Sequence, residues 1–139
     1  MATKADFTEA EWKTMQKGVT GAGMLVSASD ADFTDSFGEA SAIAKYLGAQ
    51  REAAATPLTR ELAHARGTGF GAFAGADKVE AGTIEALHSA VATLREKAPE
   101  EVDAYSQLVL GAAEHAANAK GGLAEGEAEA LDRIRAALG

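Results

Sequence analysis

The chain of 139 residues contains no cysteine. This absence excludes disulfide bonds, thiolate catalysis and cysteine-ligated zinc. Only two prolines, Pro57 and Pro99, and few runs of β-branched residues are present, which is not typical of a β protein. The longest weakly polar stretch, residues 18–29, is too short to cross a bilayer. We therefore expect a protein that is not inserted in a membrane.

Basic residues are also scarce, because 13 Lys and Arg stand against 21 Asp and Glu, a formal net charge of −8. No basic stripe occurs in the sequence, and an acidic chain of this kind binds nucleic acid and anionic membranes poorly. The first twelve residues, MATKADFTEAEW, lack the apolar core of a signal peptide. We expect a cytoplasmic protein that binds no nucleic acid.

Apolar residues recur with a period near 3.6, and abundant alanine favours close helix packing. Thr8 and Glu11 form a capping-box pattern, with Phe7 placed as the staple residue, so the first helix begins there. Its predicted buried face is Trp12, Met15, Val19, Ala22 and Val26.

Further helices are predicted along the rest of the chain. One begins near residue 33, and Gly48 leaves open whether 33–66 is one helix or several. Thr56 is a cap with Pro57 at the first helical position. The later helices begin at residue 76 or 83, at Pro99 and near residue 124. The sequence thus predicts an all-α, single-domain bundle of five to seven helices.

Several of these helices have a predicted inward face. In the second helix that face is Phe33, Phe37, Ala40, Ile43, Ala44 and Leu47. We expect one core to include Trp12, Val19, Leu47, Val91, Val109 and Ile134. Truncating a buried aliphatic side chain costs about 2–5 kcal/mol.

A glycine-rich segment, GTGFGAFAG at 67–75, divides the chain into two candidate halves, 1–66 and 76–139. No strand precedes it and no Lys-Ser/Thr follows it, so its glycines do not indicate a phosphate site. A hinge between the halves is the simpler interpretation. Phe70 and Phe73 leave two alternatives, packing in the core or contact with a partner.

Two helix–loop–helix stretches look alike: LVSASDADFTDSFGEA and EHAANAKGGLAEGEAEAL. This repeated plan resembles the TerB-like family, named for tellurite-resistance proteins, whose linking loops commonly read Asp-Gly-x-apolar-Ser/Thr-x-x-Glu. The matching residues are Gly121, Leu123 and Glu127 in the second loop and Asp30, Phe33 and Thr34 in the first. The departures are Lys120 for the Asp of the second loop, and Ala31 for Gly and Phe37 for Glu in the first.

The resemblance implies an all-helical protein with pseudo-repeated halves that serves stress-related or membrane-associated complexes. It also implies metal binding by acidic loop residues, which the departures at Lys120, Ala31 and Phe37 argue against.

Asp30, Asp32 and Asp35 form the densest acidic cluster and offer oxygen ligands for Ca²⁺ or Mg²⁺. An EF-hand loop starting at Asp30 fails, because Asp35 stands where glycine is required and Ser41 where the bidentate glutamate is required. The alternative is that Asp30 or Asp32 caps the second helix and Asp35 complements its dipole.

Glu61 and His64, like Glu85 and His88, form Glu-x-x-His motifs, which in pairs hold di-iron centres in ferritin-like bundles. The helical wheel directs His64 and Glu85 to solvent and places His88 at a boundary, whereas such ligands project inward. His64 is equally explained by its place near a helix C-terminus.

No nucleophile with a base can be identified. With the resemblance, we expect a non-enzymatic, TerB-like helical protein that acts through protein–protein contacts, with a partner protein or as a homodimer. An enzyme acting on a small organic substrate is a further alternative, but no residue can be assigned to it. No cofactor is expected, apart from Ca²⁺ or Mg²⁺ if the acidic loop binds one. The alternative is a metal-binding helical protein using Asp30–Asp35 or the Glu-x-x-His pair. Elemental analysis of the purified protein separates these two hypotheses.

Overall fold

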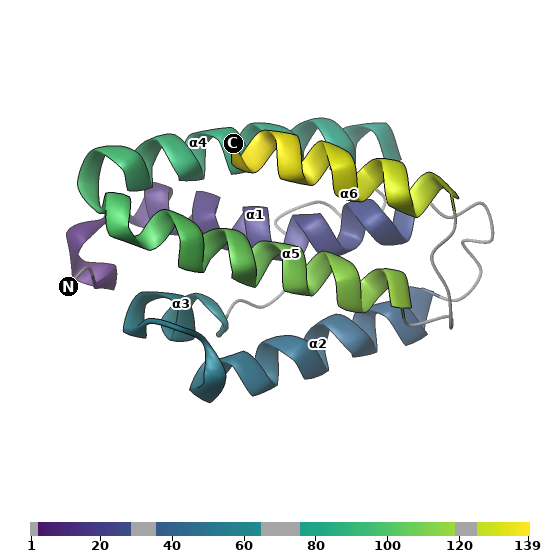
Figure 1. The fold of residues 1–139 in the computed structure, drawn as a ribbon, viewed down its shortest axis with the longest axis horizontal. Coiled ribbons are helices and arrows are strands. Elements are labelled where there is room, and N and C mark those ends of the chain that lie inside the picture. The colour runs from purple at the N-terminus through teal and green to yellow at the C-terminus, as the bar shows by residue number, and fades with distance from the viewer. Residues whose placement is uncertain (1–2, 29–35, 65–75, 119–124) are drawn as a thin grey trace.

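The computed structural model describes residues 3–28, 36–64, 76–118 and 125–139. This part of the chain forms helices joined by short loops and contains no strand, so the all-α prediction is confirmed (Figure 1). The elements are η1 (Lys4–Asp6), α1 (Glu9–Ala28), α2 (Ser36–Ala53), α3 (Pro57–Leu62), α4 (Ala76–Lys97), η2 (Pro99–Glu101), α5 (Val102–Asn118) and α6 (Glu125–Leu138).

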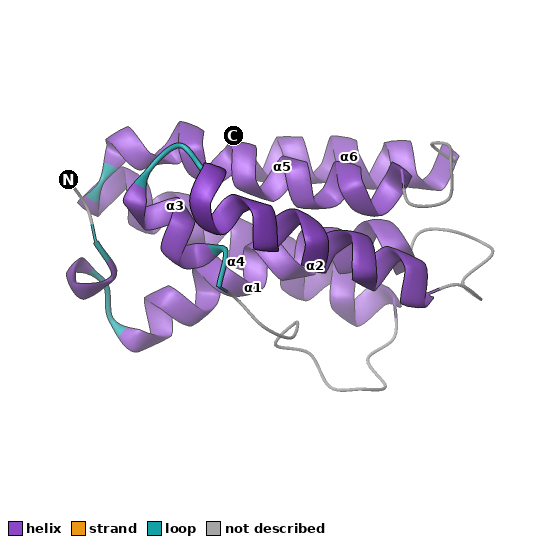
Figure 2. Ribbon diagram, turned by 90° about the horizontal axis from the view of Figure 1, so that it is seen from below, coloured by secondary structure: helices purple, strands orange, loops and turns teal. Residues whose placement is uncertain are grey.

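Helix α1 is the centre of the bundle. It packs most extensively against α4 and α5, which scarcely touch each other, and also contacts α2 and α6. Seen from below, α2 and α3 form the layer nearest the viewer (Figure 2). Because α1 belongs to the first candidate half and α4 and α5 to the second, the two halves share one core.

Glycines in α1 allow its neighbours to approach closely. A Cβ on Gly21 would lie 2.5 Å from Thr83 Oγ1 in α4, and one on Gly23 would lie 2.5 Å from Ile43 Cδ1 in α2. A Cβ atom essentially never makes a non-bonded contact this short, so both positions require glycine unless the neighbour shifts.

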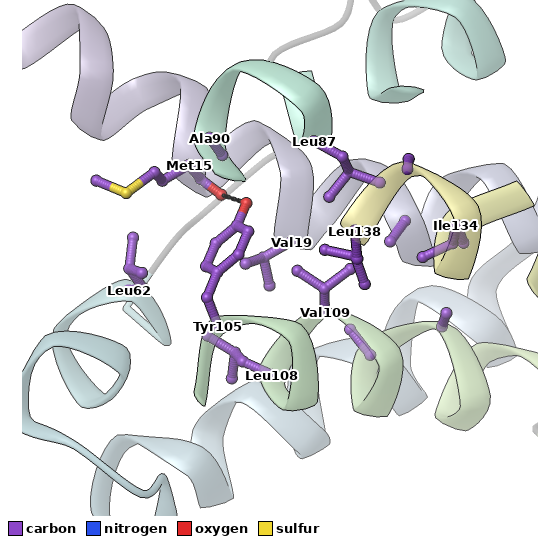
Figure 3. Close-up of a cluster of buried hydrophobic side chains, with 14 of the residues drawn as sticks. Met15, Val19, Leu62, Leu87, Ala90, Tyr105, Leu108, Val109, Ile134 and Leu138 are labelled. Atoms are coloured by element: carbon purple, nitrogen blue, oxygen red, sulfur yellow. Dashed lines mark hydrogen bonds between the residues drawn. The ribbon is translucent and has the colours of Figure 1, made fainter. Parts of the chain in front are cut away.

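The predicted core is confirmed. All six residues expected to share it are buried in one cluster, and so is the whole predicted face of α1. Figure 3 shows part of this cluster, where Val19 of α1, Val109 of α5 and Leu87 of α4 lie together. None of the helices within the described ranges is both long enough and apolar enough to span a membrane.

Helix α2 corrects one prediction. Ile43 and Leu47 are buried as expected, but Ala44 is exposed. The helix is turned so that Tyr46, on the other flank of Ile43, packs over Gly111 of α5, where a Cβ would collide with the Tyr46 ring. The Phe33, Phe37 and Ala40 side chains of the predicted face lie outside the described residues.

The described part of residues 33–66 forms two separate helices. Helix α2 continues through Gly48 to Ala53, and α3 begins separately at Pro57. Thr56 caps α3 as predicted, because its side chain accepts a hydrogen bond from the Thr59 backbone N–H. The helix that was expected to begin at residue 76 or 83 begins at Ala76.

Candidate functional site

The three aspartates of the predicted acidic loop, Asp30, Asp32 and Asp35, lie outside the described residues. The same holds for most of the two loops that carry the resemblance and for the glycine-rich segment 67–75. The candidate Ca²⁺ or Mg²⁺ site and the hinge therefore stay predictions.

The structure does not bring the two Glu-x-x-His motifs together. Glu61 and His64 are exposed at α3, which packs on α2 and α5. Glu85 and His88 are exposed on α4, which packs mainly on α1 and α6. Within the described ranges, no three His, Asp or Glu side chains gather closely enough to hold a metal ion. Inward-projecting di-iron ligands are therefore not found at these four residues.

The N-terminus lies at one end of the bundle (Figure 1). A groove opens beside the first residues of the described chain. It has a volume of about 790 Å³, within the range of ligand-binding clefts. We call it the N-terminal groove. Its lining residues come from η1, the start of α1 and α3, namely Thr3, Lys4, Ala5, Phe7, Thr8, Glu9, Trp12, Lys13, Gln16 and Glu61.

Local sequence signals build the groove. The Thr8 backbone N–H donates to Glu11 Oε1 at 2.8 Å, and the Glu11 N–H donates to Thr8 Oγ1 at 3.1 Å, so the predicted capping box is confirmed. This cap fixes the entry of the chain into α1 and folds Phe7 back onto Trp12, their ring centroids 6.5 Å apart. Both aromatic side chains are largely buried, so only their edges contribute to the groove.

A second interaction fixes the same corner of the molecule. Lys97 Nζ, at the end of α4, lies 2.6 Å from Glu11 Oε1 and 5.8 Å from the centroid of the Phe7 ring. Its hydrogen bond holds the pKa of the Glu11 carboxyl below its ordinary value, with a further contribution from the Thr8 backbone N–H. Glu11 is therefore already occupied with structural partners.

Two charges that line the groove have no oppositely charged partner among the described residues. Lys4 Nζ lies 5.5 Å from the centroid of the Trp12 ring, a cation–π arrangement, and no carboxylate pairs with it there. Glu61, from α3, has no described cation within ion-pair distance. By contrast, Lys13 pairs with Glu9 at 3.2 Å. The groove thus presents an aromatic floor with one available cation and one available anion.

Two smaller grooves lie on other faces. One, of about 480 Å³, follows the outer side of α4 and includes Ile84, Glu85 and His88. The other, of about 330 Å³, lies between the ends of α5 and α6, beside Arg95. Glu85 and His88 therefore line a different groove from Glu61, which agrees with their separation in the bundle.

One buried polar contact was missed by sequence reasoning. Glu101 is 2% exposed, and its Oε2 accepts a hydrogen bond of 2.6 Å from Thr56 Oγ1. The bond joins the cap of α3 to η2 across 45 residues of sequence. No local sequence pattern predicts a pair of residues this far apart, so the contact could be found only from the fold.

Comparisons of the chain with family models, with curated proteins and with solved structures find no match of any of the three kinds.

Proposed function

We propose that this chain is a non-enzymatic, TerB-like helical protein that acts by binding other proteins, with a stress response as its setting. The setting rests on the resemblance alone. The contact with partners is supported by one observation, the N-terminal groove with its aromatic edges and two available charges.

The composition of the groove suits a protein ligand. Aromatic side chains are enriched in the cores of protein–protein interfaces, and polar groups surround them. Trp12 and Phe7 provide the aromatic centre, and Lys4, Lys13 and Glu61 provide the polar surround. The capping box and the Lys97–Glu11 pair hold this surface in shape before a partner arrives, which lowers the entropic cost of binding.

Site-specific photocrosslinking tests the proposal. A photoreactive benzophenone amino acid replaces Ala5, an exposed residue of the groove, or Ala44, an exposed residue of α2, as the matched control. After irradiation in cells that produce the chain, we expect position 5 to give a discrete protein adduct that position 44 does not give. Identical adducts from both positions, or none from position 5, would contradict the proposal.

A further inference from the structure

The available charges of the N-terminal groove come from different elements. Lys4 belongs to η1, ahead of α1, whereas Glu61 is the one described lining residue that comes from α3. Lys13 and Glu9, also in the lining, neutralise each other at 3.2 Å. A ligand in the groove therefore meets a positive group on the η1 side and a negative group on the α3 side.

The edges of Phe7 and Trp12 line the same groove as these two groups. An apolar side chain placed there loses contact with water and gains contact with both rings. The volume of about 790 Å³ accommodates a few side chains, whereas a helix, about 10–12 Å in diameter, needs a long trough. The size thus favours a short, extended stretch of chain.

We infer that the partner presents an extended segment with an apolar side chain over the Phe7–Trp12 edges, an acidic side chain toward Lys4 and a basic side chain toward Glu61. This inference rests on the proposed function and adds the chemistry of the partner to it. Charge complementarity of this kind determines which ligand binds and in which direction, more than how tightly it binds.

Selection from a displayed library of random dodecapeptides tests the inference on the full chain. We expect the enriched peptides to share an apolar residue with an acidic residue on one side and a basic residue on the other. Lys4→Glu should convert the acidic preference to a basic one, and Glu61→Lys should convert the basic preference to an acidic one. Lys45→Glu and Glu52→Lys, at exposed positions of α2, are matched controls that should leave the selected sequences unchanged.

Binding is measured with synthetic peptides taken from the wild-type selection. The chain has one tryptophan, and Trp12 lines the groove, so its fluorescence reports binding at this place. Each charge reversal at Lys4 or Glu61 should raise the dissociation constant about three- to tenfold, since it replaces an attractive exposed contact by a repulsive one.

Three results would overturn the inference: no enriched peptide, enriched peptides without a charge preference, or a preference that both groove variants leave unchanged. The photocrosslinking experiment is independent of these results, because it detects any protein bound near position 5. A crosslinked partner together with a failed peptide selection would therefore reject the extended segment and keep the proposed function.

Discussion

The hydroxyl group of Tyr105 in α5 donates a hydrogen bond of 2.8 Å to the backbone carbonyl of Met15 in α1 (Figure 3). Both residues are fully buried, and 90 residues of sequence separate them. Gly18 leaves the space that the hydroxyl needs, because a Cβ at that position would collide with Tyr105 Oη. The contact thus fixes α5 against the middle of the bundle through one polar group in an apolar core.

Removing this hydroxyl should weaken the fold. Tyr105→Phe keeps the ring but deletes the donor, and a buried hydrogen bond contributes about 1 kcal/mol net. We expect the free energy of unfolding in urea to fall by about 1–1.5 kcal/mol. Tyr46→Phe is the matched control, because Tyr46 is half-buried and its bond to the Gln107 carbonyl is long, at 3.4 Å. An equal loss in the two variants would argue against the special role of the Met15 contact.

The same tyrosine should make the fold sensitive to alkaline pH. Burial raises the pKa of the Tyr105 phenol well above its ordinary value of 10. The unfolded chain then releases this proton at lower pH than the folded one, so the stability linked to Tyr105 is present below pH 10 and declines as the pH rises further. Urea unfolding at pH 9 and pH 11 should show a larger loss in the wild type than in Tyr105→Phe. Equal losses would contradict this linkage.

Replacing a helical glycine by alanine should lower the stability of the fold at Gly21 and raise it at Gly48. Gly21→Ala places a Cβ 2.5 Å from Thr83 Oγ1, and Thr83 is a stiff β-branched residue with no exposed surface, so we expect a loss of about 1–2 kcal/mol. Gly48→Ala meets nothing within 4 Å inside α2 and should gain about 0.5–1 kcal/mol. Denaturant unfolding of both variants, with Gly21→Ala/Thr83→Ala as the relieving pair, checks the sign of each change.

These contacts also show what the sequence could predict. The Thr8–Glu11 capping box and the Thr56–Pro57 helix start rest on residues within a few positions of one another, and the face of α1 rests on the helical period, so local sequence predicts all three. The Tyr46–Gly111 contact joins residues that are far apart in sequence, and nothing near either residue indicates it. The rotation of α2, which left Ala44 exposed, follows from that distant contact. The N-terminal groove likewise could not be predicted, because its lining residues come from η1 and α1 and from α3, which lies far from them in sequence.

Replacing Thr83 by valine should stabilise the folded protein. Its Oγ1 is buried and has no hydrogen-bond partner in the described part of the chain. An unsatisfied buried hydroxyl costs about 1–3 kcal/mol, and valine has nearly the same shape without that group. We expect Thr83→Val to raise the free energy of unfolding by about 1 kcal/mol. Thr93→Val is the control, because the Thr93 hydroxyl donates to the Ser89 carbonyl at 2.9 Å in a less buried place. A stability loss at position 83 would show that its hydroxyl is satisfied in solution.

The Thr56–Glu101 hydrogen bond should account for much of the attachment of α3 to η2. Its length of 2.6 Å and the charge of its acceptor place it among the stronger hydrogen bonds of proteins. Thr56→Val removes both this donor and the cap of α3, and the loss of the cap alone costs about 1 kcal/mol. Glu101→Gln keeps the shape of the side chain but removes its charge.

A double-mutant cycle separates these contributions. We expect a coupling energy of about 1–2 kcal/mol between positions 56 and 101, because either single change abolishes the same charged contact. The parallel cycle of Thr56→Val with Glu100→Gln, at the exposed neighbouring residue, should give coupling near zero. Urea unfolding of the six proteins, wild type included, supplies the free energies for both cycles. Coupling at position 101 that is no larger than at position 100 would mean that Glu101 is held by its burial, and that Thr56 serves α3 only as a cap.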